Sequence, residues 1–75
     1  MIQESYNGYL IKAHPIKTRT GKWAAAAVIE KIVEGKIRTE SFYADDNIHY
    51  LLEIEAAKEC INMGKNLINS NLVGF

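Results

Sequence analysis

The feature that most constrains this fold is a run of four alanines within residues 21–29, which read Gly-Lys-Trp-Ala-Ala-Ala-Ala-Val-Ile. Alanine alone favours a helix, but the tryptophan before the run and the two β-branched residues after it favour a strand. In a strand, alternate side chains face opposite sides. One face then carries Trp23, Ala25, Ala27 and Ile29, and the other carries Ala24, Ala26, Val28 and Glu30. Such small side chains permit close approach by the chain's own C-terminal helix on one face and by a second copy or a ligand on the other.

A first strand is predicted over residues 6–14, where apolar and polar side chains alternate. It should end before Pro15, because proline has no amide hydrogen to donate to a strand ladder. Residues 16–22 contain two threonines and a glycine and predict an exposed connection. The central strand then continues to about Val33.

A third strand is predicted over residues 36–44, after a tight turn at Glu34-Gly35 in which the glycine supplies a positive φ. The phase of this strand is open, because Ile37 and Phe42 can both be buried only if the strand contains a bulge. The expected order in the sheet is first, central and third strand.

One helix is predicted in the C-terminal part of the chain. Asp45-Asp46-Asn47 indicates a turn, and residues 48–52 form either a short fourth strand or an early helical turn. From Glu53 onward, acidic residues occupy the first turn and apolar residues recur at helical spacing. The positions are Ile54, Ala57, Ile61, Gly64 and Leu67 or Ile68. Gly64 is expected where the helix crosses closest to the small residues of the central strand, and the tail at residues 72–75 either folds back or stays loose.

The predicted fold is therefore α+β, a three-stranded antiparallel sheet with one C-terminal helix packed on one face. Residues 1–75 form a single domain that is small enough for its core to be marginal. A single cysteine excludes an internal disulfide, and the chain has neither a leader pattern nor an apolar run of membrane-spanning length. We expect a cytoplasmic protein.

The net charge of zero conceals two oppositely charged halves. Residues 1–43 hold seven basic and four acidic side chains, whereas residues 44–75 hold two basic and five acidic ones. We interpret these as solvated faces through which the sheet and the helix attract each other.

Several short motifs follow one another along most of the chain. They are Tyr-x-Gly-Tyr-x-Ile at residues 6–11, Pro15, Gly-Lys-Trp at residues 21–23, the glycine turn at Gly35, the aromatic Phe42, Glu-Ala at residues 55–56 and Gly-Lys-x-Leu-Ile at residues 64–68. This order resembles that of a group of small uncharacterised bacterial proteins. The resemblance implies a three-stranded sheet with one C-terminal helix, and it implies no activity, cofactor or site residue.

A second set of motifs comprises residues 6–8 (Tyr-Asn-Gly), 21–25 (Gly-Lys-Trp-Ala-Ala) and 53–57 (Glu-Ile-Glu-Ala-Ala). It resembles the plant ethylene-response-factor DNA-binding domain, which also combines a sheet with a helix. In that family, arginines on the sheet read guanine in the major groove. The corresponding positions here are Asn7, Leu10 and Val28. The resemblance therefore supports the fold, and its base-reading chemistry is not expected here.

No residue pattern indicates catalysis or metal binding. His14, His49 and Cys60 could supply three zinc ligands, but none of them has a paired ligand spacing. Asp45 and Asp46 lack the further oxygen ligands of a calcium loop. The sequence has no nucleophile elbow, phosphate loop or dinucleotide fingerprint. We expect no enzymatic activity, no cofactor and no bound metal.

Two functions of different class remain. The preferred one is a protein-interaction or self-associating module, because a single helix leaves the other face of the sheet uncovered. The predicted interaction face comprises Leu10, Lys12, Ala24, Ala26, Val28 and Arg38. The expected partner is a second copy or another protein, and no membrane is involved.

The alternative is a weak nucleic-acid-binding protein that uses a basic sheet, with Trp23 or Tyr9 as a stacking partner. Its cations would be Lys12, Lys17, Arg19, Lys22, Lys31, Lys36 and Arg38. Two observations weigh against this alternative. The net charge is zero, and the lone tryptophan of so small a domain is expected in the core.

Overall fold

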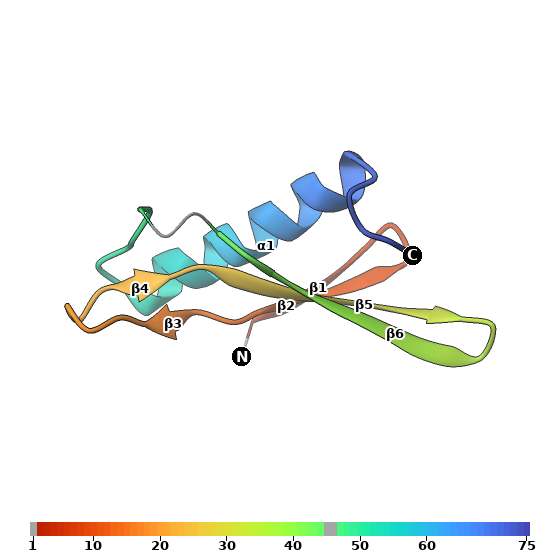
Figure 1. The fold of residues 1–75 in the computed structure, drawn as a ribbon, viewed down its shortest axis with the longest axis horizontal. Helices are drawn as coiled ribbons and strands as arrows, with labels where there is room; N and C mark the ends of the chain where they lie inside the picture. The colour runs from red at the N-terminus through yellow and green to blue at the C-terminus, as the bar shows by residue number, and fades with distance from the viewer. Residues whose placement is uncertain (1, 45–46) are drawn as a thin grey trace.

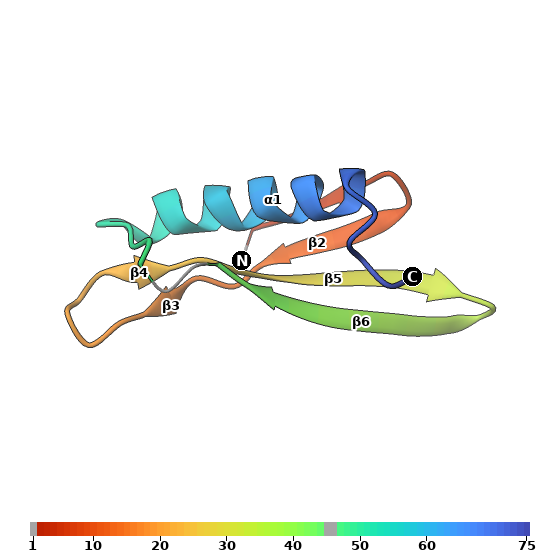
Figure 2. The ribbon, with the colours of Figure 1, turned by 45° about the horizontal axis from the view of Figure 1, so that its top comes forward.

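The structure is a computed structural model that describes residues 2–44 and 47–75. It consists of a sheet that is covered on one face by a helix (Figures 1 and 2). The main sheet is antiparallel and four-stranded, with the order β1-β2-β5-β6. Its strands are β1 (Gln3–Tyr6), β2 (Tyr9–Ala13), β5 (Ala26–Val33) and β6 (Lys36–Tyr43). A separate pair is formed by β3 (Ile16–Lys17) and β4 (Trp23–Ala24), and the helix α1 spans Glu53–Asn69. The α+β class and the C-terminal helix are confirmed.

The prediction of three strands was wrong, because the predicted first strand contains a turn. Asn7 and Gly8 have φ angles of 49° and 85°, and they join β1 to β2 so that Tyr6 pairs with Tyr9. Asn-Gly with two positive φ angles is the typical two-residue hairpin turn. The sequence signal was present at Asn7-Gly8, but the alternation of side chains continues through it and conceals it.

The central strand is extended as predicted, but it is interrupted at Ala25 between β4 and β5. Ala25, Ala26 and Ala27 are all buried, so burial does not alternate along the strand at this point. The amide of Ala26 donates to Cys60 Sγ at 3.2 Å, and therefore the backbone itself contacts the helix. Ala26 was predicted to contribute to the interaction face, but it is only 2% exposed and offers almost no surface to a partner.

The core lies between α1 and the two central strands. Its largest fully buried side chains are Ile11, Ile29 and Cys60. Gly64 lies at a close crossing, since a Cβ atom there would be 2.5 Å from Ile11 Cγ2. The close approach at Gly64 is confirmed, but its partner is Ile11 of β2 and not an alanine of the central strand.

The pairing of β5 with β6 is continuous, from Ala26 opposite Tyr43 to Val33 opposite Lys36. This register contains no bulge, so Phe42 packs against the core while Ile37 stays 69% exposed.

Other predicted core positions differ from the structure. Trp23 is half-buried and lies outside the main core, and Ile54 is 47% exposed. Residues 48–52 form no strand; within them, Tyr50 makes only an isolated bridge to Trp23. The turn predicted at Asp45-Asp46 lies outside the described residues.

The C-terminal tail folds back onto the sheet, which decides between the two alternatives for residues 72–75. Val73 packs against the core, and the ring of Phe75 lies 6.2 Å from that of Tyr9 between centroids. The Tyr9 hydroxyl also donates to the carbonyl of Phe75. The tail is therefore part of the described fold.

Candidate nucleic-acid interface

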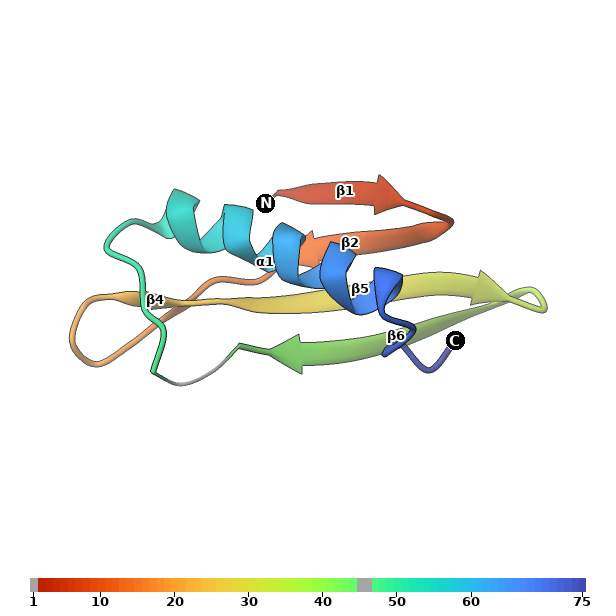
Figure 3. The same ribbon diagram turned by 90° about the horizontal axis from the view of Figure 1, so that it is seen from above.

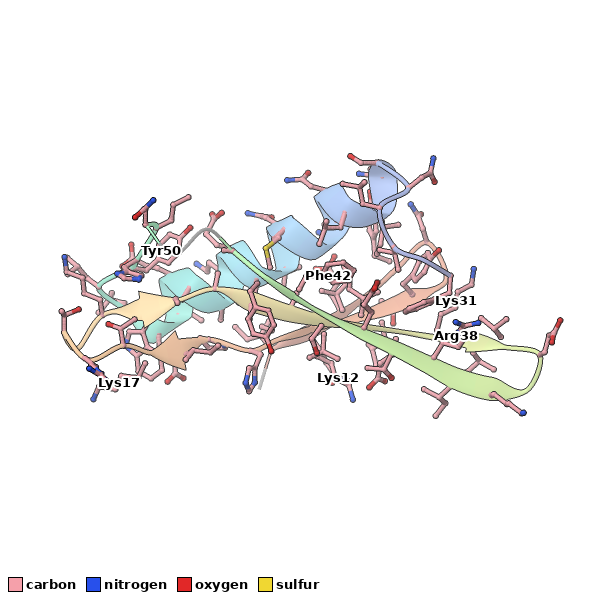
Figure 4. The ribbon with its side chains drawn as sticks, in the orientation of Figure 1. Lys12, Lys17, Lys31, Arg38, Phe42 and Tyr50 are labelled. Carbon is pink, nitrogen blue, oxygen red and sulfur yellow. The ribbon has the colours of Figure 1, made fainter. Side chains whose placement is uncertain are left out.

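The sheet face opposite α1 carries almost no net charge. The register places Leu10 opposite Glu30 and Lys12 opposite Val28, and all four side chains lie on this uncovered face. Lys12 points away from the helix in Figure 4, and its Nζ lies 3.0 Å from Glu30 Oε1. Because this pair neutralises its own charges, the uncovered face is not the basic surface that the nucleic-acid alternative assumed.

The structure separates the residues of the predicted interaction face. Leu10, Lys12 and Val28 lie together on the uncovered face, whereas Ala24 belongs to β4. Arg38 lies on the opposite face, because it pairs with Lys31.

On the helix side of the hairpin formed by β5 and β6, two cationic side chains lie over aromatic rings. The Lys31 ammonium is 4.7 Å from the centroid of Tyr9, and the Arg38 guanidinium is 5.8 Å from that of Phe75. Tyr9 therefore already has ring and cation partners within the chain, which weakens its role as a stacking platform.

Three exposed basic residues cluster on the hairpin of β3 and β4, residues 16–24, which we call the basic arm. It projects beyond the end of the main sheet (Figure 3). The longest acid-free stretch of the chain, residues 5–29, contains it. Within the arm, Lys17, Arg19 and Lys22 are all exposed. The arm therefore concentrates three positive charges without a neighbouring acid in the sequence.

Local hydrogen bonds hold the loop of the basic arm in a defined conformation. The amide of Thr18 donates to the carbonyl of Lys22 at 2.8 Å, and the amide of Gly21 donates to the carbonyl of Thr18 at 3.2 Å. The Thr18 hydroxyl adds a bond of 3.1 Å to the Lys22 carbonyl. Gly21 has φ +81°, as required after the turn of a three-residue hairpin loop. The cations thus extend from an ordered loop.

No described carboxylate neutralises the arm. Within residues 2–44 and 47–75, the ion pairs are Lys12 with Glu30 and Lys65 with Glu4. Lys65 and Glu4 join α1 to β1 and lie outside the arm. The positive charge of Lys17, Arg19 and Lys22 is therefore available to an external polyanion.

The base of the arm is tied to the segment before the helix. Trp23 and Tyr50 exchange two backbone hydrogen bonds, each of 2.8 Å. Burial raises the pKa of the Tyr50 hydroxyl, and the nearby Glu59 and Cys60 raise it further. The half-buried Trp23 thus stands where the arm joins the domain.

The three residues considered as zinc ligands lie in different environments. His14 and His49 are exposed, and Cys60 is fully buried. In the described part of the chain, no group of three His, Cys, Asp or Glu side chains could hold a metal ion. A helix long and apolar enough to cross a membrane is also absent from the described residues.

Fold and surface together define a small α+β domain with a projecting, ordered and basic hairpin. A family profile matches residues 1–72, and the chain belongs to this family, whose description is transcriptional activator HlyU. Comparisons with curated proteins and with solved structures found no significant match.

This family membership corrects the preferred prediction from the sequence. The prediction of an uncharacterised interaction module as the protein's function was wrong, because its family is described as a transcriptional activator. The finding favours the nucleic-acid alternative. The structure changes that alternative in one respect, since three of its exposed cations cluster on the basic arm and not on the uncovered sheet face.

Proposed function

We propose that this chain acts in transcriptional activation by binding DNA, and that the basic arm makes the phosphate contacts. The family description supports the choice of DNA as the partner. The observation that carries the choice of surface is the arm itself, where Lys17, Arg19 and Lys22 are exposed in an acid-free segment.

The salt dependence of binding at such an interface follows from counterion release. Each phosphate neutralised by a lysine or arginine lowers the slope of log K against log salt by about 0.9 on duplex DNA. Three arm cations therefore predict a slope of about −2.7. Binding of this kind is weak and independent of base sequence. The arginine of the arm, Arg19, can also reach base edges in a groove, where guanidinium groups recognise guanine.

Other parts of the surface have smaller roles in this proposal. The Lys12–Glu30 pair keeps the uncovered face neutral, and Lys31 and Arg38 lie over aromatic rings at the far hairpin. Trp23 remains a candidate for stacking at the base of the arm, because it is only half-buried. Binding by positioned cations requires no catalytic group, and we propose that the protein is not an enzyme.

The test is fluorescence anisotropy of a labelled DNA duplex at several salt concentrations. The parent should show a slope near −2.7, and the variant with Lys17→Ala, Arg19→Ala and Lys22→Ala should lose nearly all of it. Each single substitution should make the slope less negative by about 0.9.

A control variant should remove the same number of charges elsewhere. Lys31→Ala, Lys36→Ala and Lys58→Ala serve this purpose, because Lys31 and Lys36 lie on the far hairpin and Lys58 on the exposed side of α1. If both triple variants lose the same affinity, binding reflects net charge and the arm is not the interface. If the parent does not bind DNA at low salt, the proposed function is wrong.

A further inference from the structure

The strand β6 forms a long edge of the main sheet. It has eight residues and, among the residues that the structure describes, pairs only with β5, whereas the opposite edge strand β1 has four residues. Exposed edges invite pairing with another chain, and proteins often block them with proline, bulges or clustered lysines. The strand β6 has no proline and no bulge. Its charges are of both signs, Lys36 and Arg38 beside Glu40, so they do not repel every approaching strand.

The backbone of β6 has free hydrogen-bonding groups on its outer side. Ala44 donates its amide to Ala25 at 3.0 Å, which shows that even-numbered residues point their amides toward the neighbouring strand. In an antiparallel ladder the direction alternates with each residue. The amides and carbonyls of Ile37, Thr39, Ser41 and Tyr43 therefore point outward. None of these outward groups has a backbone hydrogen bond outside the ladder in the described residues.

Charge selects one register for two antiparallel β6 strands related by a two-fold axis. With the axis at Thr39, Arg38 lies opposite the partner's Glu40, and the symmetric pair repeats this contact. An axis at Arg38 opposes two arginines, and one at Glu40 opposes two glutamates. Like charges directly opposite destabilise a sheet, and opposite charges stabilise it. An axis at Ile37 places Lys36 against the partner's Arg38, and only the Thr39 axis matches both charges.

The same register is compatible with the backbone and with the exposed apolar side chains. Thr39 points its amide outward, so the two central threonines can exchange a pair of hydrogen bonds. Ile37 is 69% exposed and Tyr43 is 70% exposed, on the same face of β6. In this register Ile37 lies opposite the partner's Ser41 and diagonal to the partner's Tyr43. Aromatic side chains reach across that diagonal, so both exposed apolar groups would gain contacts.

We propose that the outer edge of β6 pairs with the same edge of a second copy, in the antiparallel register centred on Thr39. The two sheets then form one continuous sheet, and Arg38 and Glu40 make two symmetric ion pairs. This association uses the sheet edge and not the uncovered face. It goes beyond the DNA-binding function, and each can hold if the other fails. As a two-fold assembly it would present two basic arms.

A charge-swap series tests the register, with molar mass measured by sedimentation equilibrium over a range of protein concentrations. Arg38→Glu alone or Glu40→Arg alone places like charges opposite each other and should weaken the dimer about tenfold or more. The double variant, Arg38→Glu with Glu40→Arg, restores the complementary pairs and should recover association. Lys36→Glu is the control, because Lys36 lies directly opposite the partner's Phe42 and only diagonal to the partner's Glu40, so it should weaken the dimer less than Arg38→Glu.

A cross-linking experiment tests the axis directly. Hydrogen-bonded antiparallel pairs have Cα atoms about 5.5 Å apart, within the range of a disulfide. Thr39→Cys should therefore form a covalent dimer under mild oxidation. Ser41→Cys, the matched control, should not, because its counterpart lies four positions away along the strand. The native Cys60 is fully buried, so the parent should not cross-link.

The results of these two experiments can overturn either the dimer or its register. A parent that stays monomeric at about 1 mM overturns it. A dimer that persists unchanged in Arg38→Glu and Glu40→Arg, or that cross-links equally at Ser41→Cys, has another interface and overturns the register. Circular dichroism of each variant confirms that the fold is retained. Loss of DNA binding in the arm variant, with the dimer intact, separates this proposal from the proposed function.

Discussion

Gly64 shows how one residue limits the distance between helix and sheet. Alanine at this position would improve helix propensity by about 0.8 to 1 kcal/mol, but its Cβ atom would lie 2.5 Å from Ile11 Cγ2. The overlap is with a fully buried side chain, so we expect Gly64→Ala to destabilise the fold by about 1 to 3 kcal/mol, and Gly64→Leu by at least as much. Urea denaturation measures the change.

A matched control for this prediction is Gly74→Ala. Nothing lies within 4 Å of a Cβ atom built at Gly74, and its φ is not positive. Its free energy of unfolding should stay within about 0.5 kcal/mol of the parent. If Gly64→Ala proves as stable as Gly74→Ala, the helix can move away from Ile11 and the crossing is not tight.

The raised pKa of Tyr50 predicts that the free energy of unfolding falls at alkaline pH. Burial, Glu59 and Cys60 raise its pKa in the folded protein above the usual value of 10.0. The unfolded chain therefore releases the Tyr50 proton at lower pH than the folded one. The stabilisation is complete below pH 10 and is lost as the pH rises through the folded pKa.

Urea midpoints between pH 9 and pH 11 test this prediction. Tyr50→Phe should show a shallower loss of stability than the parent, because the other tyrosines titrate in both proteins. Parallel curves for the two proteins would contradict the predicted shift.

The basic arm is an element whose shape and charge can be changed separately. Gly21 has φ +81°, a conformation that costs an L-residue about 1 to 2 kcal/mol. Gly21→Ala keeps all three cations but distorts the loop that orients them. We expect DNA affinity to fall up to about tenfold while the salt slope stays near −2.7.

Anisotropy titrations at one salt concentration and then across a salt series distinguish these two effects. Lys22→Ala is the comparison, since it should make the salt slope less negative and leave the backbone hydrogen bonds of the loop intact. If Gly21→Ala binds like the parent, the conformation of the arm does not matter to the contact.

At the scale of the whole molecule, the C-terminal tail contacts two strands of the main sheet, β2 and β6. The Phe75 ring contacts the Tyr9 ring and lies under the Arg38 guanidinium. Removing these contacts with Phe75→Ala should lower the free energy of unfolding by about 1 to 2 kcal/mol. Leu72→Ala, on the same tail but 65% exposed, should change it by less than about 0.5 kcal/mol. Equal effects at the two positions would mean that the tail is not held by Phe75.

The sequence by itself determined the local elements of this protein. The alternation in residues 26–33 and 36–43, the turn at Glu34-Gly35 and the helical spacing after Glu53 correspond to observed elements, because each depends on neighbours a few residues apart. Asn7-Gly8 also specified a turn, although the prediction did not use it. The cations of the candidate site were all identified from the sequence, but the subset that lies together on the basic arm was not.

Tertiary structure alone decided how these elements face one another. The interruption at Ala25 directs β3 and β4 away from the main sheet, which places Lys17, Arg19 and Lys22 on a free arm. The same change leaves Trp23 outside the core. The cross-strand register pairs Lys12 with Glu30 and makes the uncovered face neutral. These outcomes depend on contacts between residues far apart in the chain, whose geometry no local pattern encodes.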